Sequence, residues 1–435
     1  MDQILQLALE AQNPWWFGKP FDSGIERLHH FPEIAQYLGT REILLLIGAR
    51  RTGKSTLVYQ IIRSLVEKGT PREAILYINL DEPVFRSHAK DPAFLHELIE
   101  EYLARHATVD QWYVCIDEVQ NYDHWVGTIK VLYDTKSSVK CILTGSTSTL
   151  LQREGSNRLS GRYFSCTVFP LSFEEFLAFR GIRNPTTIER RQAFGTYLKY
   201  GGFPRVVLEE QDAVKEQILK NYYETIYLKD IIYPNKVRNN ADVVDLLYYL
   251  ISNVGTLLSF TKISDALHIA VGTVREYIGY AENAFLLHPL MKFDFSVKKQ
   301  LANPKKIYAI DTGLANAVSF QFSENRGRLL ENIVYIALKK QNSSLYYHKG
   351  RYECDFLVKE QMKVTQAIQV ARSLGDESTR KREVRGLLEA MEVHGLAEGL
   401  ILTEEESGEE TMGGKKIHIV PIYSWLGTTG KKTGK

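Results

Sequence analysis

Short apolar runs alternate along the chain with stretches whose apolar residues recur every three to four positions. The first run, ILLLIG at residues 43–48, is continuously apolar, which is typical of a strand covered on both faces. The segment after it places Leu57, Ile61 and Leu65 on one helical face. Further apolar runs lie at 74–80, 112–117, 140–146 and 163–169, separated by helical stretches such as 91–106. This alternation predicts an α/β fold, a mostly parallel sheet flanked by helices.

The pattern changes after Pro170. Residues beyond it read as helical, with a break at Gly201-Gly202-Phe203-Pro204, and are followed by a helix pair and a hairpin typical of a winged helix-turn-helix. Ile263, Val274 and Ile278 would form the shared core of that pair. A second αβ pattern follows, with helices at 328–340 and 378–394, strands at 352–370, 398–403 and 416–422, and a polar loop at 404–416.

These changes predict six parts. They are an N-terminal segment (1–40), an α/β core (41–171), a helical lid (172–255), a winged unit (256–310), a C-terminal αβ domain (311–427) and a disordered tail (428–435).

Composition narrows the class of protein. Fifty-four basic residues against 52 acidic ones leave a net charge of +2, so any contact with nucleic acid requires a local basic patch. No apolar run approaches the ~20 residues that cross a bilayer, and the N-terminus lacks the features of a signal peptide. We therefore expect a cytoplasmic protein with no membrane partner. Its four scattered cysteines, Cys115, Cys141, Cys166 and Cys354, should be reduced core residues.

One glycine-rich segment carries strong chemical information. GARRTGKS at residues 48–55 fits G-x-x-x-x-G-K-[ST], in which backbone N–H groups and a helix N-terminus surround phosphate oxygens. Lys54 would reach the β- and γ-phosphates, and Ser55 would bind Mg²⁺. The predicted ATP-contacting set is Gly48, Ala49, Arg50, Arg51, Thr52, Gly53, Lys54, Ser55 and Thr56. The alternative is a glycine-rich turn without a ligand.

Two acids end the buried strand YVCIDE. Asp117 would hold Mg²⁺ through water, and Glu118 would orient the attacking water. A water-orienting acid favours a hydrolase over a small-molecule kinase, and Gln120 could assist it. Ser146, at the end of the next strand, could sense the γ-phosphate, although turn chemistry would also explain it.

Several motifs in a fixed order resemble a known family. They run from NPWW through GARRTGKST, CIDEVQ, LTGSTSTLL, LSGRYF, FPLSFEEFL and YGGFPRVV to PKKIYAIDTGL, GRLLENIVY, ECDFLV and IQV, nearly the whole chain. The chain resembles AAA-type P-loop ATPases. More closely, it is similar to archaeal and bacterial ATP-binding proteins with a C-terminal domain related to restriction endonucleases. The resemblance implies that Arg162 reaches a γ-phosphate, often that of a neighbouring subunit, and that Pro204 and Arg205 contact adenine and phosphate.

The resemblance also implies a metal site in the C-terminal domain. Nucleases of this kind gather a helix acid, a strand acid and an (E/Q)-x-K element around Mg²⁺, which here would be Glu331, Asp355 and Gln369. Ala371 stands where the lysine should be, so we expect a nuclease-like fold without efficient cleavage. The acids could instead stabilise the fold.

The sequence therefore predicts a Mg²⁺-dependent ATPase whose turnover moves the winged and C-terminal modules. Those modules would act on double-stranded DNA or a protein partner, with DNA phosphates meeting a basic wing of Lys292, Lys298, Lys299, Lys305 and Lys306. The alternatives are an ATP-binding regulatory or scaffold protein with slow turnover, and a DNA nuclease. If Arg162 acts between subunits, the protein would be an oligomer.

Overall fold

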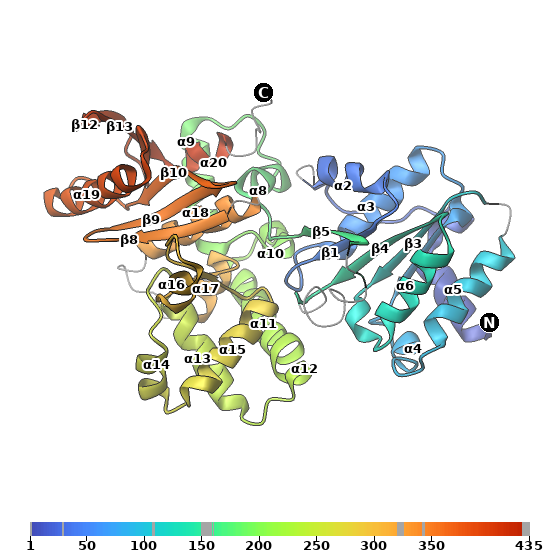
Figure 1. Cartoon of the computed structure of the whole chain (residues 1–435). Helices are drawn as coiled ribbons and strands as arrows, with labels where there is room; N and C mark the ends of the chain where they lie inside the picture. The colour runs from blue at the N-terminus through green and yellow to red at the C-terminus, as the bar shows by residue number, and fades with distance from the viewer. Residues whose placement is uncertain are drawn as a thin grey trace. The chain divides into compact units, whose positions relative to one another are not determined.

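The computed structural model describes residues 2–27, 30–106, 109–148, 159, 161–319, 326–341 and 344–428. The chain divides into two compact units, Met1–Val168 and Phe169–Lys435, whose elements are labelled in Figure 1. Most of the predicted tail, and parts of the motifs LTGSTSTLL and LSGRYF, lie outside the described residues.

The first unit is built on a five-stranded parallel sheet. Its strands are β1 (Ile43–Ile47), β2 (Ile75–Asn79), β3 (Trp112–Asp117), β4 (Val139–Gly145) and β5 (Tyr163–Thr167), in the spatial order β2-β3-β4-β1-β5. The interior strand β1 pairs with β4 and β5, so that Leu45 lies opposite Leu143 and Ser165. All five residues of β1 are buried, as its continuous apolar run predicts. The predicted parallel sheet is thus confirmed.

Helices surround this sheet. They are α1 (Gln3–Gln12), α2 (Phe31–Leu38), α3 (Lys54–Glu67), α4 (Pro83–Arg86), α5 (Phe94–Arg105) and α6 (Trp125–Thr135), with the short 3₁₀ helices η1 (Pro14–Phe17), η2 (Arg72–Ala74) and η3 (Val119–Asn121). The predicted stripe of α3, Leu57, Ile61 and Leu65, is buried in one core cluster with β1. Trp15 and Ile34 belong to the same cluster, so part of the first 40 residues packs within this unit.

The NPWW motif covers the edge of β2. Asn13 mimics a neighbouring strand, because its side chain donates to the carbonyl of Tyr77 at 2.8 Å and accepts from the Tyr77 N–H at 2.7 Å. The indole N–H groups of Trp15 and Trp16 both donate to the carbonyl of Ile75, at 3.1 and 2.8 Å. An exposed strand edge invites pairing with other chains, and these side chains satisfy it.

The second unit begins with a helical region, as expected. It contains α8 (Phe173–Phe179), α9 (Thr187–Tyr200), α10 (Pro204–Leu208), α11 (Asp212–Ile226), the π-helical segment η5 (Tyr227–Ile232), α12 (Tyr233–Asn235) and α13 (Asn240–Ser252). Helix α9 ends at Tyr200, the next residue Gly201 has a positive φ of 72°, and Pro204 begins α10. The expected break therefore separates two helices.

A helix pair and a two-stranded sheet follow. They are α14 (Phe260–Leu267), α15 (Val271–Asn283), β6 (Leu287–Leu290), α16 (Val297–Ala302), β7 (Lys306–Ala309) and α17 (Thr312–Val318). Ile263, Val274 and Ile278 are buried, and β6 pairs antiparallel with β7. Along the chain, helix α16 lies between β6 and β7, where a simple wing would have only a loop.

The C-terminal region contains a mixed six-stranded sheet. Its elements are α18 (Arg326–Lys340), β8 (Ser344–Lys349), β9 (Glu353–Glu360), β10 (Lys363–Val370), α19 (Glu377–His394), β11 (Glu398–Thr403), β12 (Gly408–Met412), β13 (Lys415–Pro421) and α20 (Ile422–Thr428), with strand order β12-β13-β11-β10-β9-β8. The expected polar loop at 404–416 is wrong, because it contains the edge strand β12. Gly413 and Gly414, both with positive φ, turn this strand back onto β13.

The prediction that the cysteines are reduced core residues is confirmed. All four cysteines are buried free thiols. None of the helices within the described ranges is long and apolar enough to span a bilayer.

Candidate nucleotide site

The loop after β1 has the backbone that phosphate binding requires. Gly48 and Gly53 have φ values of 150° and 96°, and Arg51 lies in the left-handed region at 68°. A Cβ on Gly48 would lie 2.3 Å from the carbonyl oxygen of Val168, so only glycine fits there. Helix α3 begins at Lys54. The N–H groups of its first turn have no partner within the helix, which makes this end suitable for an anion.

Side chains hold the loop in shape. The Lys54 ammonium donates to the carbonyls of Gly48 and Ala49 at 3.0 and 2.9 Å, and is buried beneath the loop. The Thr52 hydroxyl donates to the Ala49 carbonyl at 3.0 Å. Arg27, from the N-terminal segment, donates to the Thr52 carbonyl at 2.9 Å. The positive charge of Lys54 therefore lies against the anion cradle.

Asp117 lies at the carboxyl end of β3 and is 2% exposed. It accepts hydrogen bonds from the hydroxyls of Tyr77, at 2.9 Å, and Thr144. A hydrogen bond with Ser55 links it to the first turn of α3. Burial, followed by the charge of Glu118, raises the pKa of Asp117, although these hydroxyls oppose the shift. A nearby cation would favour its ionised form.

Glu118 stands at the centre of a polar cluster. It has a φ of 56°, and its N–H donates to the Thr144 hydroxyl at 3.0 Å. Its carboxylate accepts from the Gln120 amide and lies 3.9 Å from the Arg50 guanidinium. The same Gln120 amide donates to the Ser146 hydroxyl at 3.0 Å. The ends of β3 and β4 thus bring together the acids and Ser146, as the sequence predicts.

These groups fit a magnesium nucleotide. Ser55 and Asp117 offer the hydroxyl and carboxylate oxygens that Mg²⁺ prefers, next to Lys54 and the amides of the loop. The nonglycine residue Glu118 adopts left-handed backbone at the strand end, a conformation that often accompanies function.

The resemblance implies three further residues. Arg162 forms an ion pair with Asp134 at 3.1 Å, and its guanidinium stacks over the ring of Tyr133. Pro204 and Arg205 belong to the second unit, where Arg205 pairs with Glu209 at 3.3 Å. Their roles at a nucleotide stay predictions.

The C-terminal acids surround a lysine. Glu331 and Asp355 each accept a hydrogen bond of 2.9 Å from the Lys306 ammonium, while Gln369 accepts one of 3.2 Å from the Asp355 N–H. No group of three or more His, Cys, Asp or Glu side chains is arranged to hold a metal ion anywhere in the described ranges. The expected metal ligands thus enclose an ammonium, and the prediction that Lys306 belongs to a DNA-facing wing is wrong because this residue is 2% exposed.

Three residues contribute to the site in ways that the sequence did not predict. Tyr77 lies within an apolar run that gives no sign of its hydrogen bond to Asp117. Thr144 ends a buried strand, but its double role appears only when β3 and β4 pair. Arg27 precedes the loop by more than 20 residues, and no motif marks it.

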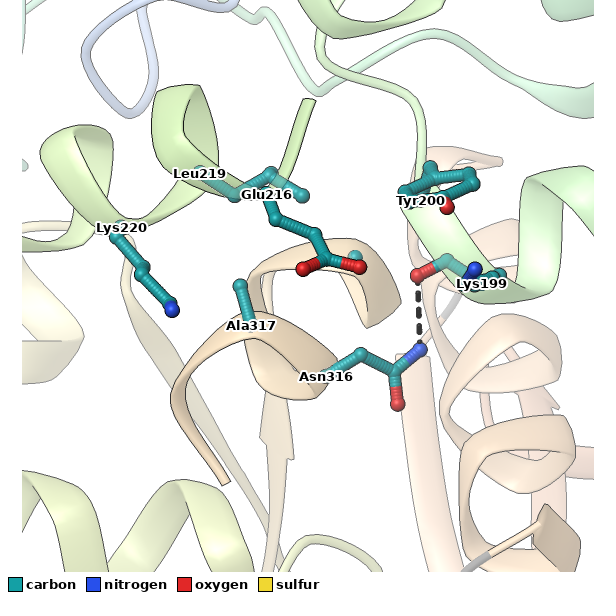
Figure 2. Close-up of a pocket in the computed structure, with 8 residues that line it drawn as sticks. Lys199, Tyr200, Glu216, Leu219, Lys220, Asn316 and Ala317 are labelled. Atoms are coloured by element: carbon teal, nitrogen blue, oxygen red, sulfur yellow. Dashed lines mark hydrogen bonds between the residues drawn. The ribbon is translucent and has the colours of Figure 1, made fainter. Parts of the chain in front are cut away.

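The second unit also contains a cleft of about 310 Å³ at the junction of α9, α11 and α17 (Figure 2). The cleft is lined by Lys199, Tyr200, Glu216, Leu219, Lys220, Gly313, Asn316 and Ala317. Asn316 donates to the Lys199 carbonyl at 2.9 Å, which ties α17 to the end of α9. The cleft adjoins Gly201 and contains none of the predicted site residues.

The parallel sheet and the glycine loop between β1 and α3 define a P-loop domain of the AAA class. Consistently, residues 40–177 match the family model described as an AAA domain, and residues 191–325 match a domain of unknown function (DUF8612).

Relatives extend over most of the chain. "Uncharacterized protein MJ1544" of Methanocaldococcus jannaschii is 31% identical over 406 residues, covering 88% of each chain. An "Uncharacterized protein" of Haemophilus influenzae is 31% identical over 345 residues, covering 77% of this chain and 84% of that one. The chain belongs to the same family as these two proteins.

Solved structures show a more distant likeness. The Aeropyrum pernix Orc1 protein in complex with DNA is 13% identical, with a TM-score of 0.33 over 71% of this chain and 96% of that chain. The Thermotoga maritima RuvB Holliday junction branch migration motor is 15% identical, with a TM-score of 0.30 over 59% and 85%.

Proposed function

We propose that this protein binds Mg–ATP at residues 48–56 and hydrolyses it, and that turnover drives a conformational switch. The supporting observation is the hydrogen-bonded network in which Thr144 links Asp117 to Glu118 while Asp117 contacts Ser55. This network places two acids with different surroundings beside the phosphate loop. A P-loop that only binds nucleotide needs the first acid but has no chemical need for the second.

The two acids would divide the work. Asp117 and Ser55 would hold Mg²⁺, which when bound neutralises charge on the phosphate oxygens. Glu118 would accept a hydrogen bond from the attacking water and orient it in line with the γ-phosphate. A positioned acid or base of this kind contributes roughly 10²–10⁴-fold to a rate. Lys54 and the loop amides would stabilise the charge on the phosphates.

A second candidate function is a switch with slow turnover. Its support is the contact of the Glu118 carboxylate with both Gln120 and Arg50. A carboxylate engaged in this way must turn before it can orient water. Slow release of Glu118 would leave ATP bound for long periods, as a regulatory protein requires.

The output of the switch is proposed to lie in the second unit. Pro204 and Arg205 would sense the nucleotide from the helical lid, and Arg162 would act on the site of a neighbouring subunit. Lys298 and Lys299, which are exposed on α16, would contact the phosphates of double-stranded DNA. A protein partner is the alternative. Action of the C-terminal domain as a nuclease is less well supported, because Lys306 lies among its acids.

Phosphate release tests the hydrolytic proposal. Glu118→Gln keeps the size of the side chain but weakens its ability to orient water, so turnover should fall roughly 10²-fold or more. Glu67→Gln, at the exposed end of α3, is the matched control and should leave the rate unchanged. ATP affinity should survive in both variants. Equal rates for Glu118→Gln and the unaltered protein would contradict the assignment, while tight binding with negligible turnover in the unaltered protein would favour the slow switch.

A further inference from the structure

Lys306 is a charged residue in a place where charge is costly. It begins β7, and its side chain is 2% exposed. Its ammonium lies 2.9 Å from Glu331 Oε1, 2.8 Å from Glu353 Oε1 and 2.9 Å from Asp355 Oδ1. An ammonium can donate three hydrogen bonds, and here it donates to Glu331 and Asp355 and forms an ion pair with Glu353. The residue is therefore fully satisfied despite its burial.

The carboxylates are held just as completely. Glu331 also accepts from the Tyr308 hydroxyl at 2.6 Å, and the second oxygen of Asp355 accepts from the Val370 N–H at 3.0 Å. Glu353 has a second partner in Lys349, at 3.1 Å. The acids come from two elements, α18 and β9, while the ammonium comes from β7. Three segments thus converge on one cation.

The charges show why a cation is needed there. Burial, and then the charge of Asp355, raise the pKa of Glu331, while Lys306 and the Tyr308 hydroxyl oppose the shift. Burial disfavours the Lys306 ammonium, but Asp355 and Glu331 outweigh it and hold the pKa of Lys306 well above its usual value. Three acids in this space would repel one another without a positive charge between them.

We propose that Lys306 is the resident cation of the C-terminal acidic cluster, so that its ammonium stands in for a divalent metal ion and keeps the cluster from binding one. Hard divalent cations need the same carboxylate oxygens, at about 2.0–2.6 Å. A metal ion could bind only if Lys306 left, and the lysine would then be stranded in the interior without partners. The domain consequently uses this arrangement to fasten β7 to α18 and β9 rather than to cleave phosphodiesters.

The arrangement also explains how the cluster has a positive charge although the lysine of the (E/Q)-x-K element is missing. Ala371 occupies the position where such a domain would supply its lysine, and a lysine from outside the element contributes the cluster's positive charge. Because it contacts Glu331 and Asp355 directly, this lysine leaves no room for a metal ion between them.

Chemical labelling of the unaltered protein is the first test. Acetylation of lysines in the folded, full-length chain is followed by mass spectrometry at several times. Lys306 should react at least ~10-fold more slowly than Lys298, which is exposed, because its modification requires local opening. Adding 1 mM Mn²⁺, about the level at which weak sites fill, should leave this protection unchanged. Equal reactivity of the two lysines, or loss of protection with Mn²⁺, would overturn the proposal.

Substitution provides the second test. Lys306→Met removes the ammonium and keeps the length of the side chain, so the acids should become a Mn²⁺ site. In this variant Mn²⁺ should raise the melting temperature by about 3 °C or more, and adding Asp355→Asn should abolish the effect. Lys363→Met, at an exposed position of β10, is the control and should show no rise in melting temperature with Mn²⁺.

Three results would contradict the proposal. The first is saturable Mn²⁺ binding by the unaltered protein that Asp355→Asn removes. The second is Mg²⁺- or Mn²⁺-dependent DNA cleavage that depends on Asp355. The third is a folded Lys306→Met variant that gains no Mn²⁺ binding. If Lys306→Met does not fold, the labelling experiment and the Mn²⁺ titration of the unaltered protein decide the matter alone. None of these measurements requires ATP, so their outcome is independent of the proposed ATPase activity.

Discussion

The side chain of Asp311 accepts a hydrogen bond of 2.7 Å from the main-chain N–H of Gly202, across 109 residues of sequence. Its other oxygen accepts from the Leu314 N–H at 3.1 Å and caps α17. The segments YGGFPRVV and PKKIYAIDTGL are therefore in direct contact within the second unit. Asp311 also follows β7 closely, so the strand that carries Lys306 leads directly to this contact.

Close approach at this contact requires glycine. A Cβ on Gly201 would lie 1.9 Å from Asp311 Oδ1, and the φ of Gly201 is 72°. Gly201→Ala should therefore lower the free energy of unfolding by about 2–4 kcal/mol through steric conflict and backbone strain. Gly195→Ala is the control, since Gly195 lies within α9 with nothing near its missing Cβ. That change should stabilise by about 0.5–1 kcal/mol. Urea unfolding of both variants gives the comparison, and equal effects would refute the steric argument.

Asp311 should also make stability depend on pH. Burial, its largest influence, raises the pKa of Asp311 from 3.8 to about 6 despite the hydrogen bonds from Gly202 and Leu314. The folded chain then retains a proton that the unfolded chain has lost. This contribution is fully present below about pH 4 and disappears as pH rises through 6, a change of up to about 3 kcal/mol.

Asp311→Asn isolates that contribution because asparagine does not titrate. The stability advantage of the unaltered protein over this variant should be larger at pH 4.5 than at pH 7.5, as measured by urea unfolding at the two pH values. An advantage that grows with pH would mean that the two N–H donors outweigh burial.

Thr144 should position both acids of the nucleotide site. Thr144→Val removes the hydroxyl that donates to Asp117 and accepts from the Glu118 N–H. We expect turnover to fall about 10-fold or more, with a smaller loss of ATP affinity, because a misplaced water-orienting acid affects the reaction more than binding. Thr144→Ser retains the hydroxyl and should recover most of the rate. Steady-state kinetics of both variants would separate this role from simple packing. If Thr144 only fills space, Thr144→Val should keep more of the rate than Thr144→Ser.

The exposed lysines of α16 predict a salt-dependent contact with DNA. If Lys298 and Lys299 meet phosphates, replacing both with alanine should weaken binding to double-stranded DNA and lower the slope of log affinity against log salt by about 2. Lys363→Ala, at an exposed strand start in the same unit, is the control. Fluorescence anisotropy at several salt concentrations measures the slopes. An unchanged slope in the double variant would exclude these lysines as the contact.

The sequence predicted those features that local pattern determines. The apolar run of β1, the glycine loop and the acids after β3 are each written in consecutive residues, and the structure places them as expected. Features that depend on distant pairing were not predictable in this way. Lys306 looked like part of a surface patch because Lys305 precedes it, and only the folded chain brings Glu331 and Asp355 to it.

Strand β12 was missed for a different reason. Its residues are almost entirely polar, and an edge strand with one neighbour does not need the apolar alternation by which strands are recognised. Only its glycine pair, Gly413 and Gly414, signals the hairpin.

The most direct test of the account is thermal stabilisation by Mg–ATP. Ligand at 100 times its Kd should add about 2.7 kcal/mol to stability, so the melting temperature of the unaltered protein should rise with Mg–ATP. Lys54→Ala removes the ammonium beneath the loop and should abolish the rise, whereas Lys68→Ala, at the exposed end of the same helix, should preserve it. A folded protein that Mg–ATP does not stabilise, or a rise that Lys54→Ala leaves intact, would contradict the nucleotide site.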